Sequence, residues 1–324
     1  ISNHFGAKHN EFICTIKDAQ NYIPQIQHAY DEPFGDSSAI PTLMLSEYAQ
    51  RHVKVALSAD GGDELFAGYN KHFEGIRNIK KATELKQKLY WLNRHIKWFK
   101  KNGQINLNSS LFPTKIYKIL SILLEDYDFH EIQNLANIYT NKDTLERLDK
   151  SNVFLPGSYF RHTLTPKGYI PNDYLNDVLK YDFSTYLVDD VLTKVDRATM
   201  YKSLEGRDPF LDNKLIELLY SIPGELKTKN NIKKSLLKSI VHRHIPEEMM
   251  NRPKKGFSVP VREWMRGDLR ELLIDTLNIE TMHKDEYLDK QYVIQLRDNY
   301  LRGDTSKFEV VWYIFSYISW LNKE

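Results

Sequence analysis

Apolar and polar positions alternate along the first part of the chain in blocks that predict an α/β arrangement. A short run over 11–16 predicts a strand, and a helix over 18–29 follows, with Asp18 as its N-cap. A second helix is predicted over 42–52. Residues 53–57 form a β-branched apolar run typical of a buried parallel strand. A strand, intervening helices and a second strand form a right-handed crossover, so the sheet is predicted to be parallel.

After residue 70 the pattern changes to a helical period. Lys and Arg crowd 71–101 between aromatic residues, a combination that is typical of nucleic-acid binding. Acidic residues are mixed in, which favours amphipathic helices whose lysines are solvated. Helical periodicity continues to residue 148, and 181–200 and 261–324 also predict helices. The last of these carries an apolar stripe formed by Trp312, Phe315, Ile318 and Leu321.

Composition supports one globular domain. The 324 residues are 41% apolar and 27% charged, and no stretch resembles an interdomain linker. A formal charge of +2 argues neither for nor against nucleic acid. The longest apolar run, 310–321, is too short to span a bilayer. Cys14 is the single cysteine, which suits a reducing compartment. We therefore expect a cytoplasmic protein that engages neither membrane nor nucleic acid.

Scattered histidines do not indicate a metal centre. None of them has an acidic or histidine partner at metal-ligand spacing on a predicted helix. We expect them at the surface or in the layer behind a site. They are His72, His95, His130, His162, His242 and His244.

Candidate chemistry begins where the predicted strand 53–57 ends. Residues 58–62 are small, and Asp60, Asp63 and Glu64 place three carboxylates within five residues. Backbone N–H groups at such a turn can approach a phosphate, and a divalent cation would bridge the phosphate to the carboxylates. One carboxylate could instead accept a proton. A solvated acidic helix start explains the same residues, so the residues alone leave these alternatives open.

A second charged cluster falls within 181–200. On a regular helix Asp190, Lys194 and Arg197 are spaced i, i+4, i+7 and share one face. The cluster is either a surface ladder of ion pairs or a polar face that lines a cleft. In the cleft, the cations would bind phosphate or a substrate carboxylate and Asp190 would be an acid–base group.

Three stretches resemble the synthetase domain of class B asparagine synthetases. Residues 57–69 read LSADGGDELFAGY and are similar to the family's LSGDGGDELFGGY. Residues 189–212 read DDVLTKVDRATMYKSLEGRDPFLD, and 252–260 read RPKKGFSVP. A weaker match at 31–42, similar to DEPFADPSALPT, helps to extend the resemblance over nearly the whole chain.

The resemblance implies an ATP-pyrophosphatase (PP-loop) type of α/β fold, helix-rich, with a partly parallel sheet flanked by many helices. It implies one domain over 1–324. Within it, 1–75 is the remainder of the α/β core, 76–180 a helical insertion, and 181–324 the helical part that completes the cleft. The family's SGGxDS loop and its glutaminase domain do not occur in the sequence. We therefore expect a core that is incomplete at the N-terminus, a chain that is inactive alone, and a missing portion supplied in cis or in trans.

The implied reaction is ATP-dependent amidation of aspartate to asparagine through a β-aspartyl adenylate, with release of AMP and pyrophosphate. Ammonia derived from glutamine supplies the nitrogen, ATP and Mg²⁺ are the implied cofactors, and a homodimer is compatible with the family. The implied site residues form four groups: Asp60, Asp190 and Lys254 for catalysis, with Lys254 closing over the α-phosphate; Leu57, Ser58 and Ala59 against ATP; Lys194, Asp196 and Arg197 for substrate or phosphate; and Asp63 for the metal.

Two departures from the family pattern leave the acceptor open. Gly206 and Asp208 stand where the family's SLEVRVPFLD has other residues, while Glu205 and Arg207 match it and imply a structural ion pair beneath the site. Alternatives to asparagine synthesis are an amidotransferase for another carboxylate, in surface-glycan or secondary-metabolite assembly, and a non-catalytic paralogue.

Overall fold

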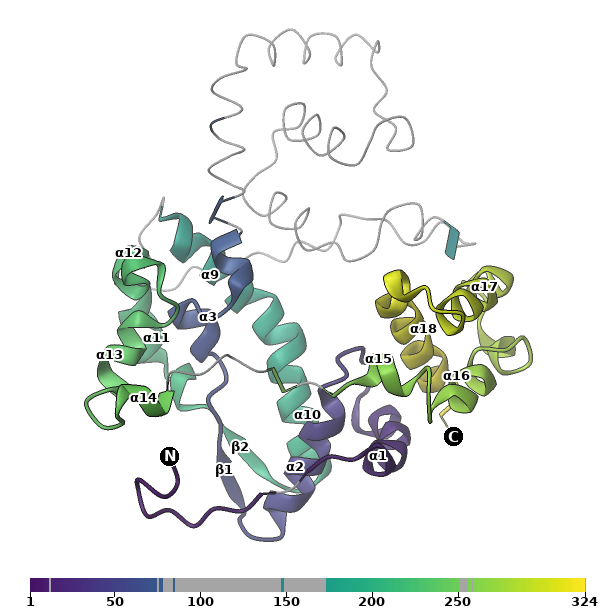
Figure 1. The fold of residues 1–324 in the computed structure, drawn as a ribbon, viewed down its shortest axis with the longest axis horizontal. Coiled ribbons are helices and arrows are strands. Elements are labelled where there is room, and N and C mark those ends of the chain that lie inside the picture. The colour runs from purple at the N-terminus through teal and green to yellow at the C-terminus, as the bar shows by residue number, and fades with distance from the viewer. Residues whose placement is uncertain are drawn as a thin grey trace, which may run out of the picture.

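The computed structural model is a helix-rich α/β structure with a small parallel sheet (Figure 1). It describes residues 1–11, 13–74, 76–77, 84, 147–148, 173–250, 256–257 and 259–323.

The first two helices pack against each other near the N-terminal end. Helix α1 spans Ile16–Ala29 and α2 spans Ala39–Gln50. The cap of α1 is Thr15, and Asp18 closes a capping box: its Oδ2 accepts from the Thr15 backbone N–H at 2.8 Å. The prediction of Asp18 as the cap is therefore wrong by three residues. The strand expected over 11–16 is also wrong, because the described residues before Ile16 have no regular structure and Ile16 is already helical.

The sheet contains two described strands, β1 at Val55–Leu57 and β2 at Glu205–Arg207. They are parallel, with Val55 opposite Glu205 and Leu57 opposite Arg207. Parallel pairing was predicted, but with 11–16 as the partner, and that pairing is wrong. The expectation of a buried strand is wrong as well, since Leu57 is 73% exposed and no described element covers it.

Four elements lie between and around these strands and position the polar residues described below. They are α3 (Gly62–Phe66), α9 (Tyr174–Ser184), the π-helix η2 (Leu187–Leu192) and α10 (Thr193–Tyr201). Helix α3 follows β1 directly and packs against α9. The segment predicted as helix over 181–200 is helical throughout except at Thr185, but η2 interrupts its regular period.

Further helices surround this centre. They are η3 (Pro209–Leu211), α11 (Asn213–Tyr220), α12 (Gly224–Lys227), η4 (Lys229–Asn231), α13 (Ser235–Val241), α14 (Glu247–Met250), α15 (Val261–Trp264), α16 (Arg270–Thr276), η5 (Thr281–Lys284), α17 (Lys290–Leu301), η6 (Thr305–Lys307) and α18 (Phe308–Leu321). In the described part of the chain, no helix combines the length and the apolar content needed to cross a membrane.

The largest hydrophobic cluster joins α1 and α2 to α16, α17 and α18, which gather on one side of Figure 1. The predicted stripe on α18 takes part: Phe315 and Ile318 are fully buried and Trp312 nearly so. A second cluster joins Leu65 and Phe66 of α3 to α11. The π-helix η2 contacts α9 on one side and α10 on the other, so these two helices position its polar residues.

Candidate active site

The turn after β1 holds Asp60 beside a second carboxylate. Ser58 donates its backbone N–H to the Arg207 carbonyl at 2.9 Å, and its hydroxyl donates to Asp60 Oδ2 at 2.5 Å. Burial raises the pKa of Asp208, and the charge of Asp60 raises it further. Gly61 has φ +83°, and a Cβ there would lie 2.4 Å from the Leu211 side chain, so the turn requires glycine. The sequence-predicted Asp60 thus sits at the carboxyl ends of both strands.

Residues predicted to contact ATP lie on the same strand end. Leu57, Ser58 and Ala59 are all exposed, and the Ser58 backbone N–H is taken by the Arg207 carbonyl. Lys254, predicted to close over the α-phosphate, lies outside the described residues.

Asp63, the predicted metal ligand, forms an ion pair. Its Oδ1 lies 3.0 Å from Lys234 Nζ. Lys234 adopts φ 54°, an uncommon conformation for a residue with a side chain. A Cβ at Gly68 would collide with both Asp63 and Lys234, so glycine leaves room for the pair. No group of three or more His, Cys, Asp or Glu side chains is placed to hold a metal within the residues that the structure describes.

Asp190 is half-buried on η2. Burial raises its pKa to about 6; the charge of Asp36 adds to the rise, while Lys194 and a hydrogen bond from Tyr186 oppose it. Lys194 Nζ pairs with Asp36 Oδ2 at 2.7 Å. That pair, with Ser38, outweighs burial and holds the pKa of Asp36 below its usual value. Asp190 is therefore the carboxylate in this group that can change charge near neutral pH.

Arg197 and Asp196, which the resemblance assigned to substrate or phosphate together with Lys194, lie at the surface. Arg197 pairs with Asp31 at 2.9 Å, and both are exposed, at 47% and 74%. Asp196 is also exposed. Glu205 and Arg207 form the predicted ion pair at 2.7 Å, but on an exposed strand and not beneath the site. Such surface pairs contribute at most about 1 kcal/mol each.

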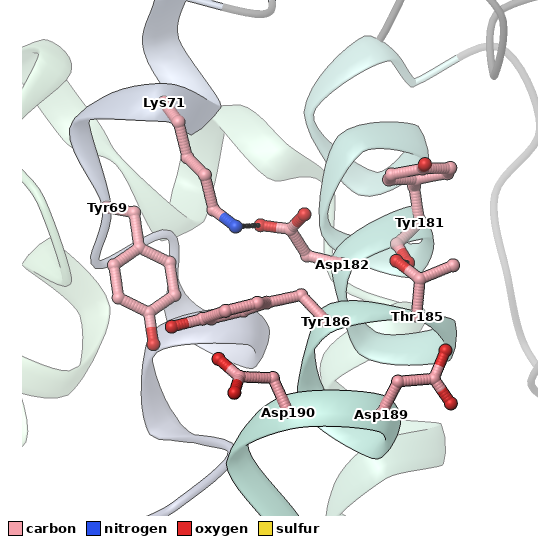
Figure 2. A pocket seen from close by; sticks show the side chains of 8 residues that line it. All are labelled: Tyr69, Lys71, Tyr181, Asp182, Thr185, Tyr186, Asp189 and Asp190. Carbon is pink, nitrogen blue, oxygen red and sulfur yellow. Dashed lines mark hydrogen bonds and ion pairs between the residues drawn. The ribbon is translucent and has the colours of Figure 1, made fainter. Parts of the chain in front are cut away.

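Next to Asp190 lies a cavity of about 540 Å³ (Figure 2). Its lining residues come from two segments, the chain just after α3 and the α9–η2 stretch: Tyr69, Lys71, Tyr181, Asp182, Thr185, Tyr186, Asp189 and Asp190. Lys71 Nζ pairs with Asp182 Oδ2 at 2.9 Å and sits 3.9 Å from the centre of the Tyr186 ring. The expectation that the lysines after residue 70 are solvated is therefore wrong for Lys71.

Behind the cavity is a buried histidine–carboxylate pair. His72 Nε2 lies 2.8 Å from Asp182 Oδ2, and the two side chains are 0% and 1% exposed. Burial lowers the pKa of His72, so the ring is neutral at pH 7. Burial acts on Asp182 in the opposite sense, but His72 and Lys71 outweigh it and keep the pKa of Asp182 below its usual value. The histidines were expected either at the surface or in the layer behind a site, and His72 lies in the layer behind the site.

A neighbouring cavity of about 800 Å³ shares Tyr186, Asp189 and Asp190 with the first. The loop 33–37 and helix α18 supply its other walls. Trp312 fixes these two together, because its Nε1 donates to the Gly35 carbonyl at 2.6 Å. Asp190 thus stands on the wall between two cavities.

Sequence reasoning missed four of these residues: Lys71, Asp182, Tyr186 and Asp36. They meet across long separations, as in the pairing of Asp36 with Lys194, and no local period connects them. The usable signal lay in the family-like stretches, because Asp36 falls inside the match at 31–42 and Lys71 follows the match at 57–69 by two residues.

Comparison with known proteins decides the family. The asparagine synthase family model matches residues 1–322. The chain belongs to the asparagine synthase family. Asparagine synthetase [glutamine-hydrolyzing] 1 of Bacillus subtilis is 30% identical over 315 residues, which is 97% of this chain and 48% of that protein.

Two further members of the asparagine synthase family give the same picture. A putative asparagine synthetase [glutamine-hydrolyzing] of Mycobacterium bovis is 27% identical, over 97% of this chain and 46% of that protein. One from Methanocaldococcus jannaschii, putative asparagine synthetase [glutamine-hydrolyzing] 2, is 31% identical over 62% of this chain and 36% of that protein. The chain thus spans about half the length of the first two relatives.

Proposed function

We propose that this chain supplies the synthetase part of an enzyme that uses ATP to convert aspartate into asparagine. The observation that carries the proposal is the continuous family match over residues 1–322. The proposed fold is of the PP-loop type, and the proposed intermediate is a β-aspartyl adenylate formed with release of pyrophosphate. The nitrogen comes from glutamine, through a glutaminase part in cis or in trans.

The second half of this reaction needs a proton acceptor, since an amine must lose a proton to become an amide. Asp60 and Asp190 are the proposed pair. Asp60 lies at the strand end that faces the nucleotide in the proposed binding mode, while Asp190 lines the cavity. With a pKa raised to about 6, Asp190 is ionised at pH 7 yet basic enough to take a proton. We assign the main transfer to Asp60 and a supporting one to Asp190.

ATP and Mg²⁺ are the proposed cofactors. The donor set suits a metal held mainly by phosphates, with Asp63 as one protein ligand, because Mg²⁺ commonly binds one or two carboxylates plus phosphate oxygens. It does not suit a metal held by protein side chains alone, because the described part of the chain has no group of three or more His, Cys, Asp or Glu placed around one point. When bound, Mg²⁺ would neutralise phosphate charge. Lys234 already neutralises Asp63 and would have to share it. Lys254 is proposed as the cation for the α-phosphate.

The test uses the protein that carries this chain, together with a pyrophosphate-binding and an ammonia-supplying part. Aspartate should drive isotope exchange between pyrophosphate and ATP, and asparagine should accumulate when ammonia is added. Lys254→Ala should reduce exchange far more than ATP binding, with Lys255→Ala as the matched control. Exchange driven by another carboxylate but not by aspartate would replace this proposal with the related amidotransferase. Absence of exchange with any acceptor would favour a non-catalytic role.

A further inference from the structure

Asp36 and Asp190 both line the larger of the two cavities, and one lysine acts on both of them. Lys194 follows Asp190 by four residues, the spacing at which an acidic and a basic side chain pair on a regular α-helix. Its Nζ instead lies 2.7 Å from Asp36 Oδ2, on the loop between α1 and α2. Within the described part of the chain, no ion pair joins Asp190 to a cation. The loop therefore binds the cation that the helix itself could have supplied to Asp190.

The pair of Asp36 and Lys194 is anchored on both sides. Ser38 donates its backbone N–H to Asp36 Oδ1 at 2.9 Å and its hydroxyl to Oδ2 at 2.6 Å. Tyr30 donates its hydroxyl to the Lys194 carbonyl at 3.0 Å. The side chains of Asp36 and Lys194 are 24% and 12% exposed, so solvent screens their attraction only in part. Lys194 consequently cannot turn to another carboxylate without breaking this pair.

Other groups that carry charge or titrate face Asp190 from every element around the two cavities. The acids and lysines are Asp36, Lys71, Asp182, Asp189, Lys194 and Glu309, and the tyrosines are Tyr30, Tyr69, Tyr181, Tyr186 and Tyr313. Lys71 pairs with Asp182, and Glu309 pairs with Arg262 at 2.7 Å. An ordinary tyrosine loses its proton near pH 10, so the acids and lysines set the field at Asp190 between about pH 5 and 8.

The field at Asp190 depends on where the Lys194 ammonium lies. Burial raises the pKa of Asp190 to about 6, the charge of Asp36 adds to the rise, and Lys194 opposes it. A cation in direct contact with an aspartate lowers its pKa by about 1 to 3 units. The strength of Asp190 as a base is therefore kept only while Lys194 stays with Asp36.

We propose that Asp36 is a positioning residue for Asp190: it binds the Lys194 ammonium and so keeps this cation away from the Asp190 carboxylate. Asp36 touches no reacting atom in this role, and no covalent step is involved. A carboxylate without a bound cation holds its proton more tightly, so Asp190 stays the stronger base. This electrostatic role stands on the contacts described above, whereas its use in amide formation rests on the proposed function.

The direct test is a titration of Asp190 in the protein that carries this chain. With carbon-13 in the aspartate carboxyl groups, NMR follows each resonance from pH 4 to 8, and the resonance lost in Asp190→Asn belongs to Asp190. Asp36→Asn keeps an acceptor for Ser38 but gives up the charge that binds Lys194. It should lower the Asp190 midpoint by about one unit or more, a tenfold loss of proton affinity. An unchanged or raised midpoint overturns the proposal.

A second background separates the release of Lys194 from the charge of Asp36 itself. Lys194→Met should raise the Asp190 midpoint, because it removes the cation and leaves Asp36 uncompensated. Asp36→Asn should shift the midpoint less in that background than in the parent, since no lysine is left to release. An equal shift in both backgrounds overturns the positioning role. Lys194→Met also decides the question if Asp36→Asn does not fold, because an unchanged midpoint in it contradicts the proposal.

The matched control removes a charge from the same loop at a different ion pair. Asp31→Asn breaks the exposed pair with Arg197 and should leave the Asp190 midpoint unchanged. A shift as large as that of Asp36→Asn would show a general effect of loop charge and overturn the proposal.

The rate profile tests the use of this pair in amide formation. In the completed enzyme, Asp36→Asn should move the decline in amide formation to lower pH by the shift that NMR measures. An unmoved decline would overturn that use. A shifted NMR midpoint in an enzyme without aspartate-driven exchange would refute the proposed function alone.

Discussion

Two carboxylates with a proposed share in one reaction stand in very different surroundings. Asp60 lies on a tight turn at the end of an exposed two-stranded sheet, where its Oδ2 accepts from the Ser58 hydroxyl. Asp190 lies half-buried on a π-helix, where the charge of Asp36 acts on it and two cavities adjoin it. The same side chain is therefore poised differently by burial and neighbouring charge. The comparison teaches that the residue type marks a candidate, whereas the surroundings decide what it can do.

The largest expected effect contrasts ion pairs in the two regions. Asp182→Ala should lower the free energy of unfolding by about 1 to 3 kcal/mol, because it leaves the buried His72 ring without its hydrogen-bond partner. Glu205→Ala, at the exposed strand end, should cost about 1 kcal/mol or less. Urea unfolding of both variants measures the difference. Equal losses would mean that the cavity floor is no more rigid than the strand end.

Proton transfer is the next contrast. Asp60→Asn keeps size and hydrogen-bonding capacity but removes the proton acceptor. In the completed enzyme, pyrophosphate release should persist while amide formation falls by about 10²-fold. Asp190→Asn should reduce amide formation by about tenfold. The measurement is the ratio of amide to pyrophosphate. An unchanged ratio in Asp60→Asn would exclude Asp60 as the proton acceptor and leave it the role of stabilising the turn.

A pH profile sharpens the assignment of Asp190. Its pKa is raised to about 6, so its base form is lost as the pH falls through that value. Amide formation should therefore decline below about pH 6 in the parent and in Asp60→Asn. The decline should be absent at that pH in Asp190→Asn. Initial rates of amide formation from pH 5 to 8 test this. If the decline below pH 6 persists in Asp190→Asn, it belongs to another titrating group.

The smallest effect concerns stability. A carboxyl whose pKa is raised on folding binds its proton more tightly in the folded state, so its contribution is favourable below its ordinary pKa and is lost as the pH rises through about 6. Asp190→Asn should consequently stabilise the chain by about 1 kcal/mol at pH 7.5, after allowance for partial exposure, and give no gain at pH 4. Urea midpoints at the two pH values check the sign. Destabilisation at pH 7.5 would contradict it.

Local patterns predicted several elements well. The helices α1 and α2, the strand β1 and the helical C-terminal segment were expected near their observed positions, because each carries its own period or its own caps. Strand β2 was missed: Glu205–Arg207 is polar, three residues long and exposed, and its pairing comes from a distant segment. Asp18 was predicted as the N-cap of α1, but Thr15 is the N-cap and Asp18 is the third helical residue of the same capping box.

The site prediction assumed a uniform helix over 181–200, whereas the π-helix η2 interrupts that period. The i, i+4, i+7 rule placed Asp190, Lys194 and Arg197 on one face; Lys194 pairs with Asp36 and Arg197 with Asp31, and both partners lie in the loop between α1 and α2. Asp190 alone of the three lines the cavities. Its partners are chosen by tertiary contacts that no single segment encodes. The roles of Asp60, Asp63 and Lys254 stay predictions, since they depend on ligands and partners.

The number of residues in the π-helix η2 sets how far α10 is rotated relative to Tyr186, and so where Lys194 points. A residue in an α-helix advances by about 100° and 1.5 Å, so deleting one residue from 187–192 would turn α10 by that angle relative to α9. Lys194 would then turn away from Asp36, and a different side chain would replace Asp190 on the cavity wall. A substitution here changes one side chain and keeps the spacing, whereas a single-residue deletion would change which side chains of this segment line the cavities.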